Sequence, residues 1–174
     1  QRPVRMVMKL EDVMEGIGKR YPCFFDYEVG VNGEGVIQYA NTNVYEDNGS
    51  AFNEPVISQY TFPNYTSVYD AKVWGTNMYD VKTDKPCSCW MRAPGTLEAE
   101  TIPEQIIEHI AHEIGKDPLT VRIKNFSKEH PILPMVSLIK EKSNYEVRKN
   151  AVKEFNEENV WKKRGISVVP MRLP

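Results

Sequence analysis

The sequence predicts an α+β domain, because β-type patterns dominate its first half and helical patterns dominate its second half. The clearest strand is residues 24–31, where large apolar residues alternate with polar ones. The clearest helix is residues 103–114, where isoleucines recur at helical spacing. We therefore expect an antiparallel hairpin or meander, then helices, and then a final strand.

The elements before residue 50 are short. Residues 4–8 alternate loosely and predict a strand, and residues 10–14 predict one helical turn. The strand at 24–31 ends at the dipeptide Asn32-Gly33, which is the strongest short hairpin signal, and residues 35–40 form the returning strand. The stretch that follows is irregular and rich in aromatic residues.

One more strand is expected around residues 72–76, and helices follow it. Thr101 and Glu104 have the spacing of a capping box, with Pro103 in the first helical turn. Ser143 and Glu146 have the same spacing before a longer helix. The further helical segments are expected at 118–125, 135–139 and 144–161, and the last strand at 166–169.

The composition is that of an ordinary soluble domain. The chain has 174 residues, is 41% hydrophobic and 26% charged, and carries a net charge of −2. Lysine and arginine are scattered among acidic residues, which argues against nucleic acid as a partner, and no 18-residue apolar run predicts a membrane span. The odd number of cysteines (three) argues against a disulfide framework and favours the cytoplasm. Both ends resemble the interior of a longer polypeptide.

Three patterns resemble sites but are better explained by structure. Residues 108–113 place His109 and His112 close enough to share a metal, but helical phase turns them away from the isoleucine face, so we expect a solvated surface. The adjacent acids Glu46 and Asp47 are most simply surface charge. The Cys87-Ser88-Cys89 motif lacks the second ligand pair that a zinc site needs.

The remaining candidate is the loop at residues 90–95, with the sequence Trp-Met-Arg-Ala-Pro-Gly, directly before the predicted helix. An arginine and a backbone that bends closely at Pro-Gly can bring a cation and N–H groups to an anionic cofactor. An ordinary structural loop has the same composition, so both interpretations stay open from the residues alone.

The loop and its surroundings resemble a known family. The segment Met91–Gly95, the helix after it, and segments 2–5, 27–40, 117–125 and 159–165 together resemble the aldehyde oxidase and xanthine dehydrogenase family of molybdenum hydroxylases, over essentially the whole chain. The Met-Arg-Ala-Pro-Gly sequence is most similar to insect-type and plant-type aldehyde oxidases. On this resemblance, residues 1–174 are part of a larger molybdenum-cofactor (molybdopterin)-binding domain and are incomplete at both ends.

The resemblance implies a role for three residues. Arg92 matches the family arginine that lies near molybdenum and contributes to the cofactor site through its main chain. Pro94 stands where xanthine dehydrogenases have a phenylalanine that stacks on the purine, so a flat π-surface is missing. Tyr60 stands where they have an arginine that orients the purine, and a neutral tyrosine cannot make the same charge-assisted bonds. Both differences favour an aldehyde over a purine.

The implied function is oxidation of an aldehyde to a carboxylic acid, with water as the oxygen source and oxygen as the electron acceptor. The glycine-rich stretch and the general-base glutamate of the family are expected outside this chain, as are the 2Fe-2S clusters and FAD of the parent, a cytoplasmic homodimer. The chain alone is therefore expected to be inactive and marginally stable. The alternatives are a xanthine dehydrogenase-type purine hydroxylase and a non-catalytic homologue that keeps only the fold.

Overall fold

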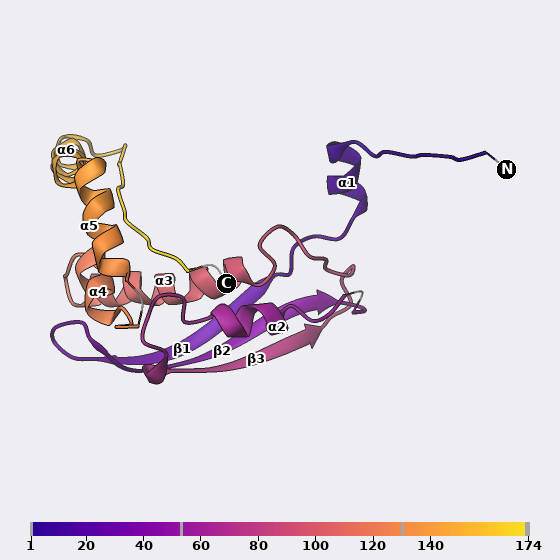
Figure 1. The fold of residues 1–174 in the computed structure, drawn as a ribbon, viewed down its shortest axis with the longest axis horizontal. Coiled ribbons are helices and arrows are strands. Elements are labelled where there is room, and N and C mark those ends of the chain that lie inside the picture. Colours follow the sequence, from indigo (N-terminus) through magenta and orange to yellow (C-terminus); the bar gives the residue numbers. More distant parts are fainter. Residues whose placement is uncertain (1, 53, 130, 173–174) are drawn as a thin grey trace.

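The computed structural model describes residues 2–52, 54–129 and 131–172. In this part of the chain, a three-stranded sheet in the order β1-β2-β3 lies beneath the long helix α3 (Figure 1). The strands are β1 (Cys23–Val31), β2 (Ile37–Gly49) and β3 (Trp74–Lys82). The helices are α1 (Leu10–Gly16), α2 (Ser58–Thr61), α3 (Thr96–Glu113), α4 (Pro118–Asn125), α5 (Ile132–Lys142) and α6 (Tyr145–Glu158), with short 3-10 turns η1 (Phe62–Asn64) and η2 (Ala71–Val73). The predicted α+β class is confirmed.

The predicted hairpin is confirmed as β1 and β2, which pair in antiparallel register. Its turn is fixed by the side chain of Asn32, whose Oδ1 accepts the backbone N–H groups of Glu34 and Val36, each at 3.0 Å. Gly35 completes the turn with a φ of 83°, a conformation that costs glycine little. The predicted position of the turn is therefore confirmed, but the left-handed residue is Gly35 and not Asn32 or Gly33 of the predicted dipeptide.

The expectation of a meander is wrong at the third strand, because β3 pairs with β2 in parallel. The connection between them carries α2, η1 and η2 and returns the chain to the end of the sheet where β2 begins. A parallel pair requires such a crossover, whereas two antiparallel strands can be joined by a tight turn. The strand pattern at 72–76 gave the right region, but it contains no information about direction.

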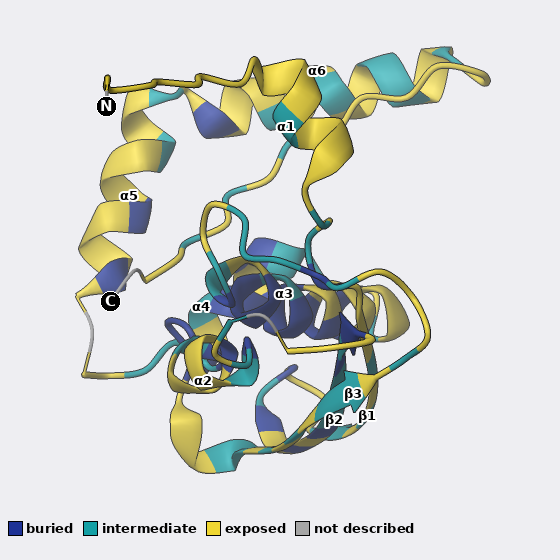
Figure 2. Cartoon of the chain, turned by 90° about the vertical axis from the view of Figure 1, so that its right-hand side faces the viewer, coloured by how far each residue is buried: buried dark blue, intermediate teal, exposed yellow. Residues whose placement is uncertain are grey.

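The core lies between the sheet and α3. Ile102, Ile106 and Ile110 of α3 are buried together with Ala40 and Val44 of β2. The predicted isoleucine face is therefore confirmed as the core face. Figure 2 shows the buried residues concentrated in α3 and the strands below it, while α1, α5 and α6 are largely exposed.

The helix α3 begins at Thr96, well before the predicted start at Pro103. The predicted capping box is not formed, because the Thr101 hydroxyl donates to the carbonyl of Leu97 (2.6 Å) within the helix. Ala99 and Ile102 are buried, so packing of the first turns against the core extends the helix past the proline. The longer helix places its N-terminus directly at the Met-Arg-Ala-Pro-Gly loop.

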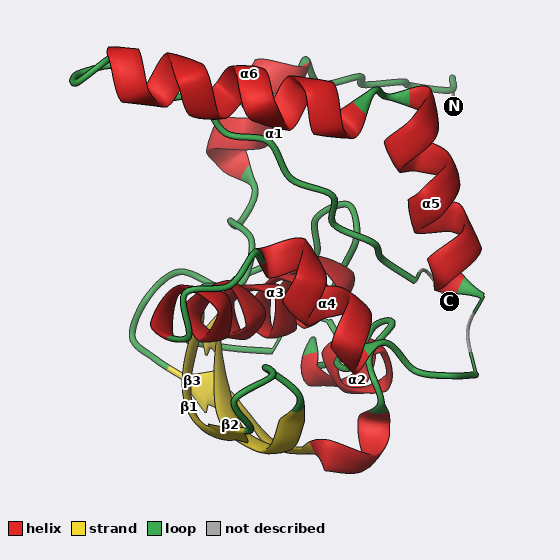
Figure 3. Cartoon of the chain, turned by 90° about the vertical axis from the view of Figure 1, so that its left-hand side faces the viewer, coloured by secondary structure: helices red, strands yellow, loops and turns green. Residues whose placement is uncertain are grey.

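The second-half helices are confirmed in position, but the one side-chain cap observed among them was not predicted. Asp117 caps α4, where its carboxylate accepts the N–H groups of Leu119 (2.8 Å) and Thr120 (3.3 Å). The capping box predicted for α6 is wrong, because the Ser143 hydroxyl donates back to Lys140 and the N-cap Asn144 has a left-handed backbone without a side-chain cap. Helices α5 and α6 project away from the sheet (Figure 3).

The two terminal strands predicted from the sequence are not formed in the described part of the chain. Residues 4–8 are exposed, and residues 166–169 pair with no strand. Alternation of side chains predicts a strand only where a partner edge is available, and neither segment lies along one. No helix among the described residues is long and apolar enough to cross a membrane.

Candidate functional site

The candidate site is the loop between β3 and α3. Its backbone is tightly bent, since Ala93 and Gly95 both lie in the left-handed region, with φ values of 60° and 68°. Gly95 is the N-cap of α3 and has no side chain to cap the first helical turn. The first N–H groups of a helix have no partners within it and carry its positive partial charge. The loop therefore leads into a helix end that favours an anion.

The structure brings all three predicted site residues to this loop. Arg92 is exposed, and its guanidinium forms no ion pair with any residue that the structure describes. Pro94 is partly buried two residues later. Tyr60 belongs to α2, and a methyl group placed on Gly95 would lie 2.6 Å from its Cβ, so α2 touches the loop.

Trp90 closes the same side of the loop. Its ring meets that of Tyr60 edge to face, with centroids 4.8 Å apart. Its backbone N–H donates to the Glu54 carboxylate at 2.7 Å, and its indole N–H donates to the carbonyl of Pro55 at 3.2 Å. The start of the loop is thus fixed to residues that precede α2. The sequence drew attention to Trp90 only as part of the loop and gave no sign of these partners.

The N-terminal segment of residues 18–20 supports the opposite side of the loop. Gly18 lies so close to Cys87 that a Cβ on it would be 2.2 Å from the Cys87 carbonyl oxygen. The backbone carbonyl of Lys19 accepts the N–H of Cys89 at 2.9 Å. Arg20 donates to backbone carbonyls farther along the loop. This segment was not predicted to support the loop, because no motif in it indicates the contact.

Two acids of the sheet hold α2 in place through hydroxyl groups. The Thr61 hydroxyl donates to Glu46 and the Ser58 hydroxyl donates to Asp80, each at 2.6 Å. Glu46 is completely buried, so the interpretation of the Glu46-Asp47 pair as surface charge is wrong for Glu46. Burial raises the pKa of Glu46 to about 7, against the opposing hydrogen bond from Thr61 and with a smaller contribution from the negative charge of Asp80.

The raised pKa of Glu46 predicts a pH-dependent stability. The folded protein binds a proton at Glu46 up to pH about 7, whereas the unfolded chain releases it near the ordinary value of 4.5, so this residue lowers stability as pH rises between the two. Glu46→Gln keeps an acceptor for Thr61 and cannot ionise. We expect the variant and the wild type to unfold at similar urea concentrations near pH 4.5, and the variant to be the more stable above pH 7. A stability difference that does not change with pH contradicts this assignment.

The two histidines of α3 lie on the protein surface. His109 and His112 are exposed, as predicted, and His109 Nδ1 is hydrogen-bonded to the Tyr27 hydroxyl. Glu108 is exposed as well, and its carboxylate pairs with the buried Arg122. Within residues 2–52, 54–129 and 131–172, no group of three or more His, Cys, Asp or Glu side chains is arranged to hold a metal ion.

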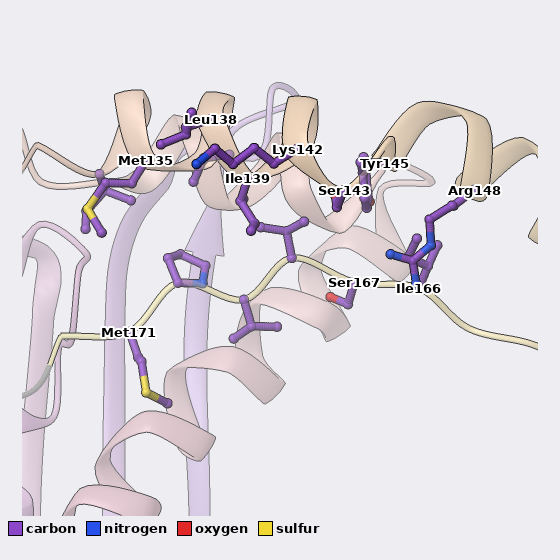
Figure 4. Close-up of a pocket in the computed structure, with 15 residues that line it drawn as sticks. Met135, Leu138, Ile139, Lys142, Ser143, Tyr145, Arg148, Ile166, Ser167 and Met171 are labelled. Atoms are coloured by element: carbon purple, nitrogen blue, oxygen red, sulfur yellow. The ribbon is translucent and has the colours of Figure 1, made fainter.

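An apolar groove lies apart from the loop, between α5 and residues 166–171 (Figure 4). Met135 and Ile139 of α5 line one side, and Ile166 and Met171 line the other. None of the three predicted site residues lines it. The segment that was expected to form the last strand therefore packs along a helix.

The domain is of α+β type, and its bent loop leads into a helix N-terminus of the kind that binds an anionic cofactor. The family model for the molybdopterin cofactor-binding domain matches residues 1–126. The chain therefore belongs to this family, within the molybdenum hydroxylases that include aldehyde oxidases and xanthine dehydrogenase.

Relatives and solved structures agree with this assignment. The chain is 30% identical to aldehyde oxidase 4 of Arabidopsis thaliana and 30% identical to xanthine dehydrogenase of Dictyostelium discoideum, over 98% and 99% of its length. It spans about 14% of the length of these relatives. The aldehyde oxidoreductase of Desulfovibrio desulfuricans superposes with a TM-score of 0.68 at 22% identity, covering 79% of this chain and 16% of that one.

The residues present fit the group that this family binds. Molybdopterin is an anionic cofactor, and the loop offers the exposed cation of Arg92 beside the N-terminus of α3, which has no side-chain cap. The left-handed backbone at Ala93 and Gly95 bends the chain so that main-chain groups can approach a ligand closely. Three acids near the loop have partners: Glu54 accepts the Trp90 N–H, Glu98 pairs with Arg20, and Glu46 accepts the Thr61 hydroxyl.

Proposed function

We propose that this chain is the segment of a molybdenum-dependent aldehyde oxidase in which the Met91–Gly95 loop forms one wall of the cofactor and substrate pocket. The parent enzyme oxidises aldehydes to carboxylic acids, with water as the oxygen source and oxygen as the electron acceptor. The cofactor supplies the metal chemistry when it is bound. Arg92 and the main chain around it hold the cofactor near molybdenum, and the general base lies elsewhere in the parent.

The contact between α2 and the loop carries this proposal. Tyr60 and Pro94, which lie far apart in the chain, were expected to be substrate-pocket residues from the family resemblance. In the structure, the α2 residues Tyr60 and Thr61 lie against Gly95, the neighbour of Pro94. Two positions that should contact the same substrate are thereby brought to the same loop.

The side chains at these two positions favour an aldehyde. Pro94 offers no aromatic face on which a purine could stack. Tyr60 is 37% exposed and offers a neutral hydroxyl, which can donate to an aldehyde oxygen but cannot make the charge-assisted bonds with which an arginine orients a purine. The Trp90 ring, edge-on to Tyr60, adds apolar surface beside it.

The parent protein is proposed to carry the remaining machinery of the family. Its 2Fe-2S clusters and FAD lie outside this segment and pass electrons from molybdenum to oxygen. The parent works in the cytoplasm as a homodimer on small aldehydes, and nucleic acid and membrane are not among its partners. The similarity of the loop to insect-type aldehyde oxidases belongs to the same proposal.

Steady-state kinetics of the purified full-length protein test the proposal. We expect measurable molybdenum in the protein and a higher kcat/KM for aromatic or aliphatic aldehydes than for hypoxanthine. Preferred turnover of hypoxanthine would replace the aldehyde assignment with the xanthine dehydrogenase-type alternative, since a relative of that name is equally similar in sequence. A protein that lacks molybdenum and oxidises neither substrate would be a non-catalytic homologue.

A further inference from the structure

Arg20 is distant from the candidate loop in sequence but binds its backbone directly. Its Nη2 donates to the carbonyl oxygen of Arg92, and its Nη1 donates to the carbonyl oxygen of Ala93 at 3.4 Å. The same Nη1 lies 3.5 Å from the carboxylate of Glu98 in the first turn of α3. One guanidinium therefore joins two consecutive loop carbonyls to the helix that follows them.

Both ends of this connection are fixed. On one side, Tyr21 is 4% exposed, and the segment before Arg20 is hydrogen-bonded to the loop through Lys19 and Cys89. On the other side, the Glu98 side chain is 5% exposed. Arg20 itself is about one-third exposed, so it is reachable from solvent while it spans two rigid parts of the structure.

The orientation of the carbonyls determines what the loop presents on its other side. In a trans peptide, the C=O and the next N–H point in opposite directions. Because Arg20 holds the Arg92 carbonyl, the N–H of Ala93 is directed away from Arg20. Pro94 has no N–H, so the next peptide offers no competing donor. Arg20 thus selects one orientation for the single amide donor between Arg92 and Pro94.

We propose that Arg20 is a positioning residue for the cofactor loop, which holds the Arg92 and Ala93 carbonyls so that the Ala93 N–H faces the anionic cofactor. This inference rests on the proposed function of the loop. Arginine suits the role because its planar fork can bind two carbonyls and a carboxylate together. A lysine would supply the charge but not the fork.

Hydrogen exchange of the full-length protein tests whether Arg20 holds the loop. In Arg20→Ala, we expect the amides of peptides covering residues 91–97 to exchange about tenfold faster or more, because charge-assisted bonds to the loop are lost. Arg20→Lys should lie between the variant and the wild type. Arg5→Ala is the matched control, since Arg5 is exposed, and its exchange should equal that of the wild type. Unchanged exchange in Arg20→Ala, with the protein folded, overturns the proposal.

Molybdenum and pterin content of the same purified proteins test the consequence. We expect Arg20→Ala to retain about a tenth of the wild-type content or less, with Arg20→Lys intermediate and Arg5→Ala unaffected. If Arg20→Ala is insoluble, Glu98→Gln tests the proposal instead, because it removes the charge that pairs with Arg20 and keeps a side chain of the same size. It should raise exchange in residues 91–97 in the same direction, and unchanged exchange overturns the proposal.

Different results would contradict the proposed function and the positioning role of Arg20. A wild-type protein without molybdenum overturns the proposed function, while the exchange rates still decide whether Arg20 holds the loop. A wild-type protein with full molybdenum content whose Arg20→Ala variant keeps that content overturns the positioning role alone.

Discussion

The Gly95→Ala variant of the full-length protein is expected to lose about 100-fold in aldehyde turnover, because the substitution displaces the loop from α2. The added Cβ would lie 2.5 Å from the backbone nitrogen of Thr61 and 2.6 Å from the backbone carbonyl carbon of Tyr60. Backbone atoms cannot move aside by changing rotamer. The left-handed φ of 68° adds strain of about 1–2 kcal/mol for a residue with a Cβ.

Gly115 provides the matched control for this experiment. It follows the C-terminal end of α3 with a similar φ of 63°, but a Cβ there would meet nothing within 4 Å. Gly115→Ala therefore carries the same backbone strain without the collision. We expect it to retain near wild-type turnover and molybdenum content. Equal losses in the two variants would show that strain, and not contact between the loop and α2, is responsible.

The Arg122→Ala variant is expected to lose about 3–5 kcal/mol of stability, because it leaves a buried carboxylate without its cation. Arg122 is 1% exposed, and its Nε donates to Glu104 at 2.7 Å while its Nη2 donates to Glu108. Glu104 is itself buried and accepts the hydroxyl of Tyr69. This network joins α3 to α4. Pulse proteolysis of the full-length protein in urea should show cleavage of this segment at a clearly lower urea concentration.

Two further variants separate the ion pair from the general effect of a substitution. Lys124→Ala, on the same helix, removes an exposed pair with Glu34 and should change the stability little, because solvent screens exposed ion pairs. Adding Glu104→Gln to an Arg122→Met protein removes the unpaired charge while keeping an acceptor for Tyr69. We expect the double variant to recover part of the stability that Arg122→Met alone loses. No recovery would show that packing of the arginine stem, and not the buried charge, dominates.

Local features of the sequence were sufficient for the hairpin and for the helix core. Asn32 specifies its turn through its own side chain, and Ile106 and Ile110 mark the buried face of α3 by spacing alone. Asp117 likewise caps α4 through residues that follow it directly. In each case the deciding interaction lies within a few residues in the chain.

The remaining features depend on partners that are distant in the sequence. The direction of β3 follows from the crossover between it and β2, and the start of α3 at Thr96 follows from packing against the core. Arg20 was not singled out and Glu46 was interpreted as surface charge, since nothing near them in the sequence reveals the Arg92 carbonyl or the Thr61 hydroxyl. Arg92, Pro94 and Tyr60 came from the family resemblance, and their pocket roles stay predictions.

A structure of the full-length protein with its cofactor bound is the most direct test of the central claim, that the Met91–Gly95 loop forms a wall of the molybdenum cofactor pocket. We expect main-chain groups of Arg92 or Ala93 within hydrogen-bonding distance of the cofactor, with Tyr60 and Pro94 facing the space beside molybdenum. A cofactor bound elsewhere, with other parts of the polypeptide between it and this loop, would contradict the claim.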